Sequence, residues 1–265
     1  MAKEKAAVFV DNSNIFKGTQ QFSTHLRKSG RLPENRYLSI RWDNLLDILE
    51  GQNGGIDVFA RHFFASLPPA ADVSKLTKRP TEDEWNTLVK QSAQTGFYKA
   101  IQGPPCNFVL HGIPLRFADV LCRNKTKQAY YRCRDSQGGV IKCKLSLDLD
   151  QCYSCDRKFL FKYEKGVDVA LAVALTIFSG VGQTALDRVI LVAGDGDYKE
   201  AVRQVRQQVG RDVQIVSWRK PLSKELEQLS NKPPLILDEF WEQVCDIRSK
   251  APLEEMPGVP EEGED

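Results

Sequence analysis

The sequence has no long apolar run and only three histidines, and these two absences set the first limits on it. A membrane-spanning helix needs about 20 consecutive apolar residues, and no stretch of the chain approaches that length. The apolar run near the N-terminus stops at Asp11. It is too short for the core of a secretory signal peptide and instead predicts a first strand. We therefore expect a cytoplasmic protein with no membrane partner.

Several familiar catalytic and nucleotide-binding motifs are missing as well. His25, His62 and His111 are scattered and lie in no metal-spaced motif. His62 falls in a predicted strand of aromatic residues, where a packed side chain is expected. There is no readable Ser/His/Asp arrangement, no G-x-G-x-x-G after the first strand, and Lys17-Gly18 is not part of a P-loop. These absences argue against serine-hydrolase chemistry and against dinucleotide or P-loop nucleotide binding.

Charge of both signs is present, but it is unevenly distributed. The formal net charge is +2. The tail Glu254–Asp265 holds six acids and no base, which leaves 37 Lys and Arg against 29 Asp and Glu, a net +8, on residues 1–253. Residues 116–165 alone hold 12 bases and 6 acids. This concentration favours a polyanionic partner, and a solvated charged surface is the alternative.

Predicted strands and helices alternate along most of the chain. This pattern indicates an α/β fold with parallel strands and helices on both faces of one sheet. Among the predicted strands are residues 58–64, 97–101 and 188–192. The exception is a basic, cysteine-rich stretch, which we interpret as an insertion at about residues 104–163 in a single domain spanning residues 1–250. The acidic tail, residues 251–265, is predicted to be disordered.

Two acids and two glycines follow a predicted buried strand at residues 188–192, as Gly194-Asp195-Gly196-Asp197. The glycines allow a tight turn and the close approach of a ligand. Asp11 holds the same position after the first predicted strand. Sites in open α/β sheets form beyond the carboxyl ends of the strands, so we expect these acids to meet at one edge of the sheet.

A fourth acid, Asp168, opens a strongly apolar predicted helix. Apolar residues three, four and seven positions later share its helical face, so its carboxylate is expected to point inward, where the helix dipole favours negative charge. Converging carboxylates repel one another unless a divalent cation neutralises them, and oxygen-only ligation suits Mg²⁺ or Mn²⁺. Asn14, one turn after Asp11, is placed to hold a carboxylate or a metal-bound water.

Each of these acids also has an ordinary structural interpretation as a helix cap or turn residue. Their joint placement favours a site. Asp195, at the strand end, is the stronger candidate for direct metal contact, whereas Asp197, next to the helix start, is either a ligand or a cap.

Three segments resemble the NYN domain, in the LabA-like branch of the PIN-like nucleases: VFVDNSNIF, KGVDVALAVAL and VILVAGDGDYKEAVRQVRQQVGRDVQIVSW. They combine D-x-x-N after the first strand, KG-x-D opening a helix and GD-x-D before a helix, in the family's order. With the sheet between them they cover most of residues 6–243. The resemblance implies a three-layer α/β/α fold with a mainly parallel central sheet. It also implies an acidic cluster of Asp11, Asp168, Asp195 and Asp197, with Asn14 beside it.

The activity that the resemblance implies is that of a ribonuclease, a hydrolase that cleaves phosphodiester bonds in RNA with Mg²⁺ or Mn²⁺. Metal ions held by the carboxylates would lower the pKa of a bound water and offset charge on the phosphate. We expect endonucleolytic cleavage of single-stranded RNA. DNA stays an alternative substrate because such a cluster does not read the sugar, and the sequence does not decide between a monomer and a homodimer. The family often has Ser or Thr where this chain has Ala193, so any hydroxyl contribution is missing.

Five of the seven cysteines fall within the strongly basic residues 116–165. Cys152 and Cys155 have the spacing of a zinc knuckle, whereas the others are isolated. Residues 133–143 (CRDSQGGVIKC) are predicted to form a hairpin. The candidate zinc ligands are Cys133, Cys143, Cys152 and Cys155. Reduced, partly buried thiols are the alternative, in keeping with an odd cysteine count and no secretory signal.

The same stretch interleaves Lys and Arg with aromatic residues, a combination that binds phosphates and stacks on unpaired bases. We expect it to grip single-stranded RNA; the candidate contacts are Arg132, Arg134, Lys142 and Lys144. The alternative is that the aromatic side chains form a small core of their own.

Two other functions compete with the nuclease. A haloacid-dehalogenase-type phosphatase also uses a first-strand Asp and a late GD-containing loop, but the second acid of its D-x-D motif is absent from Asp11-Asn12-Ser13. A non-catalytic RNA-binding module that keeps the NYN fold is the other. Ala193 leaves that alternative open, whereas the presence of all four acids argues against it.

Overall fold

The computed structural model describes residues 3–51, 55–67, 96–114, 132–134, 140–142, 166–180 and 186–249. Contacts divide the chain into two compact units. The first unit combines Met1–Val8, Ser13–Phe59 and Gly182–Asp265, and the second combines Phe9–Asn12 and Ala60–Val181. Within the described residues no helix is both long and apolar enough to cross a membrane.

The central element is a six-stranded sheet with the order β4-β3-β1-β7-β8-β9. Its strands are β1 (Glu4–Asp11), β3 (Ile56–Leu67), β4 (Val109–Pro114), β7 (Arg188–Val192), β8 (Asp212–Ser217) and β9 (Leu235–Ile236). The pairs β3–β4, β7–β8 and β8–β9 are all parallel. Every residue of β7 is buried, as expected for a strand covered on both faces. The sheet is mainly parallel and is accompanied by helices, which confirms the predicted three-layer α/β/α fold of the PIN-like kind.

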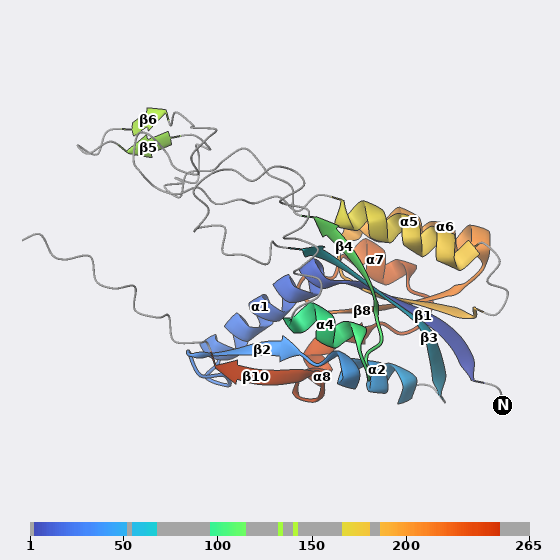
Figure 1. The fold of residues 1–265 in the computed structure, drawn as a ribbon, viewed down its shortest axis with the longest axis horizontal. Helices are drawn as coiled ribbons and strands as arrows, with labels where there is room; N and C mark the ends of the chain where they lie inside the picture. Colours follow the sequence, from blue (N-terminus) through green and yellow to red (C-terminus); the bar gives the residue numbers. More distant parts are fainter. Residues whose placement is uncertain are drawn as a thin grey trace, which may run out of the picture. The chain divides into compact units, whose positions relative to one another are not determined.

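Five helices belong largely to the first unit: α1 (Asn12–Lys28), α2 (Trp42–Gly51), α6 (Lys199–Gln204), α7 (Lys224–Leu229) and α8 (Leu237–Val244). Helix α2 contacts α8, and α6 contacts α7 (Figure 1). A π-helical turn, Val205–Val209, continues α6 and ends at Gly210, which has a left-handed φ of 74°. A two-stranded antiparallel sheet pairs β2 (Arg36–Ile40) with β10 (Cys245–Ser249).

Close packing against Trp218 fixes the position of α1. A Cβ atom on Gly18 would lie 2.4 Å from Trp218 Cδ1, so only glycine fits at this position without a shift. The Trp218 Nε1–H donates a hydrogen bond of 3.0 Å to Thr19 Oγ1. Phe22 stacks on the same indole with ring centroids 4.8 Å apart. The helix that follows Asp11 is therefore held rigidly on residues that follow β8.

The second unit contains α4 (Gly96–Gln102) and α5 (Val167–Gly180). The prediction of a strand at residues 97–101 is wrong, because this segment is α4. Its aromatic content suggested a strand, but only Ile101 of the helix is buried, and Phe97, four residues earlier, is exposed. Tyr98 anchors α4 by donating a 3.1 Å hydrogen bond from its hydroxyl to the Ser66 carbonyl.

The predicted insertion differs from the structure at its start. Residues 109–114 form β4 and belong to the central sheet, so the interruption begins after Pro114 and not near residue 104. The strands β5 (Arg132–Arg134) and β6 (Val140–Lys142) pair antiparallel with Arg132 opposite Lys142. This pairing confirms the predicted hairpin. The rest of residues 115–165 and the predicted acidic tail lie outside the described residues.

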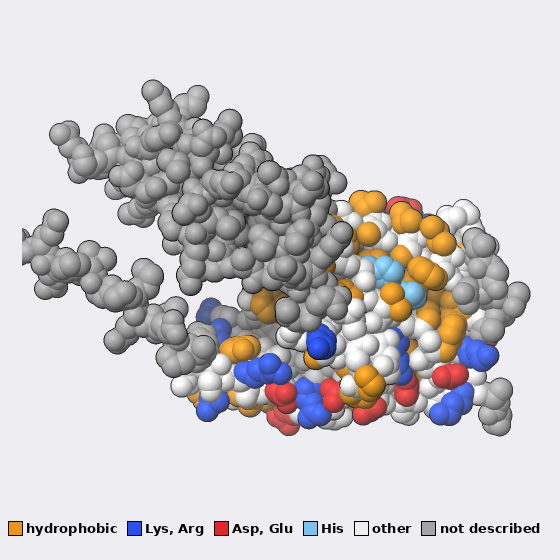
Figure 2. Space-filling model, in the orientation of Figure 1, with side chains coloured by type: hydrophobic (Ala, Val, Ile, Leu, Met, Phe, Trp, Pro, Cys, Tyr) orange, Lys and Arg blue, Asp and Glu red, His pale blue; other side chains and the backbone are white. Residues whose placement is uncertain are grey.

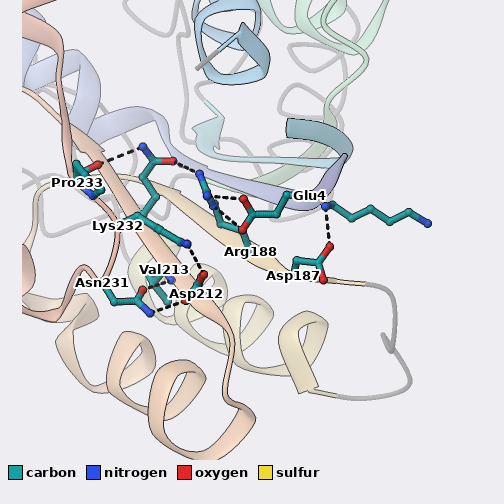
Figure 3. A network of polar contacts seen from close by, with 10 residues as sticks. Glu4, Asp187, Arg188, Asp212, Val213, Asn231, Lys232 and Pro233 are labelled. Carbon is teal, nitrogen blue, oxygen red and sulfur yellow. Dashed lines mark hydrogen bonds and ion pairs between the residues drawn. The ribbon is translucent and has the colours of Figure 1, made fainter. Parts of the chain in front are cut away.

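A polar network joins the amino-terminal ends of β1, β7 and β8 (Figure 3). The guanidinium of the buried Arg188 donates to both carboxylate oxygens of Glu4 and, at 3.1 Å, to Gln214 Oε1. The amide of Gln214 donates in turn to the Pro233 carbonyl at 3.2 Å. Arg188 is the first residue of β7 and Gly194 follows the last one, so this network lies at the opposite end of β7 from Gly194.

Candidate active site

Gly194, the first residue of the acidic turn after β7, is closely surrounded by protein. Gly194 is buried, and a Cβ atom there would lie 2.4 Å from Ser217 Oγ and 3.0 Å from the Leu222 backbone. The Gly194 N–H donates 2.8 Å to Asn14 Oδ1, and the Gly194 carbonyl accepts 2.9 Å from the Ser223 N–H. Glycine is needed here because its neighbours in the protein leave no room for a side chain. This reason differs from the predicted one, which was the close approach of a ligand.

The two acids of the turn have different surroundings. Asp195 is partly buried and caps the 3₁₀ turn Gly196–Tyr198, with its Oδ1 accepting from the Asp197 N–H at 3.1 Å. Asp197 is exposed. Tyr198, fully buried, anchors the far side of the turn. The capping role that the sequence offered to Asp197 therefore belongs to Asp195, which still has a second carboxylate oxygen.

Asn14 ties α1 to this turn. Its side chain is 8% exposed, and its Oδ1 is engaged by the Gly194 N–H. This placement puts Asn14 beside the acidic turn, as predicted, and gives its Oδ1 a backbone partner; a contact of its amide with a carboxylate or a metal-bound water stays a prediction. A buried N–H without an acceptor is costly, so the contact fixes the turn relative to α1.

Asp11 and Asp168 belong to the second unit. Asp11 ends β1 and is 2% exposed. Asp168 lies in the first turn of α5 and is exposed, so the prediction that it points inward is wrong. The buried stripe of α5 begins one position earlier, at Val167, and continues through Leu171 and Leu175. Asp168 shares the helical face of Leu175, seven positions later, but it is exposed in the open first turn of the helix.

The predicted convergence of four acids spans the two units and stays a prediction. Asn14, Asp195 and Asp197 lie in the first unit, and Asp11 and Asp168 lie in the second. In the part of the chain that the structure describes, no group of three or more His, Cys, Asp or Glu residues is arranged to hold a metal ion.

The other predicted contacts lie largely outside the described residues. Of the zinc candidates, Cys143, Cys152 and Cys155 are outside, and Cys133 is placed only as a backbone position of β5. Arg132, Arg134 and Lys142 likewise have backbone positions in the hairpin, whereas Lys144 is outside. Zinc binding and RNA binding by these residues stay predictions.

Sequence reasoning missed the residues at the start of α7. Ser223 supports the turn through its N–H and also caps α7, where its side chain accepts 3.1 Å from the Leu226 N–H. Glu225, two residues later, pairs with Lys199 at 3.4 Å. Its Oε2 would lie 3.9 Å from a Cβ atom on Gly196, which Ser223 also approaches. A serine just before a short helical pattern was a readable N-cap signal, but its contact with Gly194 depends on the fold.

The prediction that His62 is a packed side chain is confirmed. It is 6% exposed, stacks on Phe9 with ring centroids 5.0 Å apart, and places its Nδ1 3.0 Å from His111 Nε2. Burial, together with the neighbouring His111, lowers the pKa of His62 to about 4. Burial also lowers the pKa of His111. Figure 2 shows histidine atoms among hydrophobic side chains on one face of the molecule.

A protein-family model matches part of the chain. The NYN domain model matches residues 125–232, a range that includes Asp168 and the turn 194–197 but begins after Asp11 and Asn14. No curated protein was found to match the chain. Among solved structures, the chain is similar to the crystal structure of a protein of unknown function from Vibrio parahaemolyticus, with 14% identity and a TM-score of 0.42. The alignment covers 92% of this chain and 97% of the other, and a likeness at that level carries no argument about function. Over residues 125–232 the chain is therefore similar to the NYN domain, the family that its sequence predicted.

Proposed function

We propose that this chain is a metal-dependent endoribonuclease that hydrolyses phosphodiester bonds in single-stranded RNA. The observation that carries the proposal is the turn 194–197 of the NYN domain. It presents two carboxylates to solvent beyond the carboxyl end of a fully buried parallel strand. Sites in open α/β sheets form at this edge.

The turn is held firmly enough for catalysis. Asn14 and Ser223 bond the two backbone polar groups of Gly194, and the buried Tyr198 anchors the other end. Catalytic groups have to be held within about 0.5 Å of the productive geometry. A carboxylate that also caps its own turn, as Asp195 does, loses little freedom when a ligand binds.

The donor chemistry of the turn fits Mg²⁺ or Mn²⁺. These ions prefer oxygen ligands and are commonly bound through one or two carboxylates while keeping several waters. Asp195 and Asp197 would hold the ion, and Asp11 and Asp168 are the further predicted ligands. When bound, the ion supplies an activated water and offsets negative charge on the phosphate.

Cleavage of a labelled, unstructured RNA by the purified chain tests this proposal. We expect cleavage in Mn²⁺ or Mg²⁺ that stops when a chelator is added and returns when excess metal is restored. Internal fragments from a substrate blocked at both ends would establish endonucleolytic cleavage. Cleavage that persists in chelator would contradict the proposed chemistry.

A second candidate is an NYN module that binds RNA without cleaving it. Ala193 favours this candidate, because its fully buried side chain brings no hydroxyl to the end of β7. Metal-independent RNA binding with no cleavage in Mn²⁺, Mg²⁺ or Zn²⁺ would select the module over the nuclease.

A further inference from the structure

Helix α1 exposes an aromatic ring two positions after Asn14, the residue that bonds to the acidic turn. Phe16 is 57% exposed, more than any other phenylalanine in the described residues. It lies four positions after Asn12, the first residue of α1, which puts it about 6 Å along the helix axis from the start of the helix. Single exposed hydrophobic side chains are common on protein surfaces, so exposure alone does not make Phe16 a binding residue.

Phe16 interrupts a face of α1 that is otherwise polar. The buried face of this helix includes Asn14, Ile15, Gly18, Thr19 and Leu26. The exposed positions that follow Phe16 along the helix are all polar: Lys17, Gln20, Gln21, Thr24, His25 and Lys28. An apolar ring at the end of a polar face contributes nothing to the core. It lies on the same helix as Asn14, the residue that bonds to the acidic turn.

A cationic residue follows Phe16 in the sequence. Lys17 is exposed and forms no ion pair with any other described residue. It follows Asn14 by three positions, so the two side chains lie on neighbouring parts of the helix surface. Aromatic rings that stack on bases, with lysines that contact phosphates, make up the usual surface for single-stranded nucleic acid.

We propose that Phe16 and Lys17 form a nucleotide subsite in which the ring stacks on an unpaired base and the ammonium group contacts the adjoining phosphate. This inference rests on the proposed function and deepens it. The bases of a duplex are already stacked on their neighbours, so an exposed ring stabilises the binding only of strands whose bases are unpaired. The subsite therefore selects unpaired RNA beside the acidic turn.

Equilibrium binding measured in chelator separates this subsite from catalysis, because no metal is present to support cleavage. Fluorescence anisotropy of a labelled oligouridine and of a blunt RNA duplex is compared for the wild type and for Phe16→Ala, Phe16→Trp and Phe59→Ala. Phe59 is the matched control: it is 46% exposed and lies near the amino-terminal end of β3. We expect Phe16→Ala to weaken oligouridine binding about 5- to 100-fold. Phe16→Trp should keep or tighten it, and Phe59→Ala should leave it unchanged.

Lys17 is tested through salt. Replacing a phosphate-contacting lysine lowers the slope of log affinity against log salt by about 0.7 for a single strand. We expect that change for Lys17→Ala and none for Lys28→Ala, an exposed lysine at the far end of α1. Equal slopes for the two variants would overturn the phosphate contact.

Failure of the subsite and failure of the nuclease are distinguishable. Unchanged oligouridine binding by Phe16→Ala, in a chain that cleaves RNA, overturns the subsite and leaves the nuclease standing. Weakened binding by Phe16→Ala, in a chain that never cleaves, supports the subsite and rejects the nuclease. An equal loss for oligouridine and duplex would overturn stacking. A change in sedimentation without a change in RNA binding would assign Phe16 to contact with a second copy of the chain, which also overturns the subsite.

Discussion

At the scale of single residues, the acidic turn depends on contacts that have no sequence pattern. The end of the predicted strand located Gly194–Asp197 correctly, because a run of apolar residues followed by glycines is a local signal. The division of labour between the acids was not predictable. It depends on a backbone conformation that brings the Asp197 N–H to Asp195 Oδ1. The need for glycine at position 194 likewise comes from Ser217 and Leu222, which are distant in sequence.

Asn14→Leu tests whether Asn14 positions the turn. The variant keeps the side-chain size but leaves the buried Gly194 N–H without its acceptor, which costs about 1–3 kcal/mol of stability. We also expect a large fall in kcat with little change in KM, because the turn loses its support while the RNA contacts elsewhere remain. Urea unfolding and steady-state cleavage measure the two effects.

Asn44→Leu is the matched control for that variant. Asn44 donates an exposed 2.7 Å hydrogen bond from α2 to the Gln243 carbonyl. Exposed contacts of this kind change stability by within about 0.5 kcal/mol, and cleavage should be unaffected. If Asn14→Leu behaved like Asn44→Leu, Asn14 would have no positioning role.

At the scale of elements, periodicity predicted which segments are helices and strands better than it predicted where single side chains point. Helix α5 shows why. Asp168 lies on the same helical face as the buried Leu171 and Leu175, as the periodicity indicated, yet it is exposed because it occupies the first turn. The segment 97–101 shows the same weakness in short elements, because a five-residue segment rich in apolar and aromatic side chains suits a strand or a helix equally well.

The contact between β3 and β4 predicts a dependence of stability on pH. His62 has a pKa of about 4 in the folded chain and about 6.5 when unfolded. Between these values the unfolded chain binds the proton more readily, so stability is lost as the pH falls from about 6.5 towards 4. At pH 5 the loss from this group is about 2 kcal/mol. Urea unfolding at pH 7.5 and pH 5 should show it.

His62→Phe removes the titrating group and keeps an aromatic ring against Phe9. The variant should lose about 2 kcal/mol less than the wild type between pH 7.5 and pH 5. Identical losses for the two proteins would mean that His62 does not carry the effect.

At the scale of the whole molecule, the alternation of strands and helices was enough to predict the α/β fold, because parallel strands require crossover connections. The three family segments predicted the match to the NYN domain model over residues 125–232. The start of the interruption after β4 was not predictable, since residues 109–114 are a short edge strand flanked by prolines and basic residues. The two ends of the sheet also have different roles. The buried network of Arg188 stabilises the amino-terminal end, and the acidic turn at the carboxyl end forms the proposed catalytic site.

Arg188→Met tests this division between stability and activity. Removing the guanidinium leaves Glu4 and Gln214 without their shared donor, and breaking such a buried pair costs about 3 kcal/mol or more. We expect a lower urea midpoint, with unchanged cleavage per folded molecule well below that midpoint. A loss of cleavage at full folding would show that the network supports the site as well.

Single-turnover cleavage of unstructured RNA in Mn²⁺ by the variant Asp195→Asn tests whether Asp195 is part of a metal-dependent nuclease site. The asparagine amide oxygen can still accept from the Asp197 N–H, so the turn should keep its shape. Asp187→Asn is the matched control, because Asp187 precedes the other end of β7 and accepts from the Lys5 N–H. We expect Asp195→Asn to be folded and inactive, and Asp187→Asn to cleave like the wild type. Undiminished cleavage by Asp195→Asn would contradict this expectation.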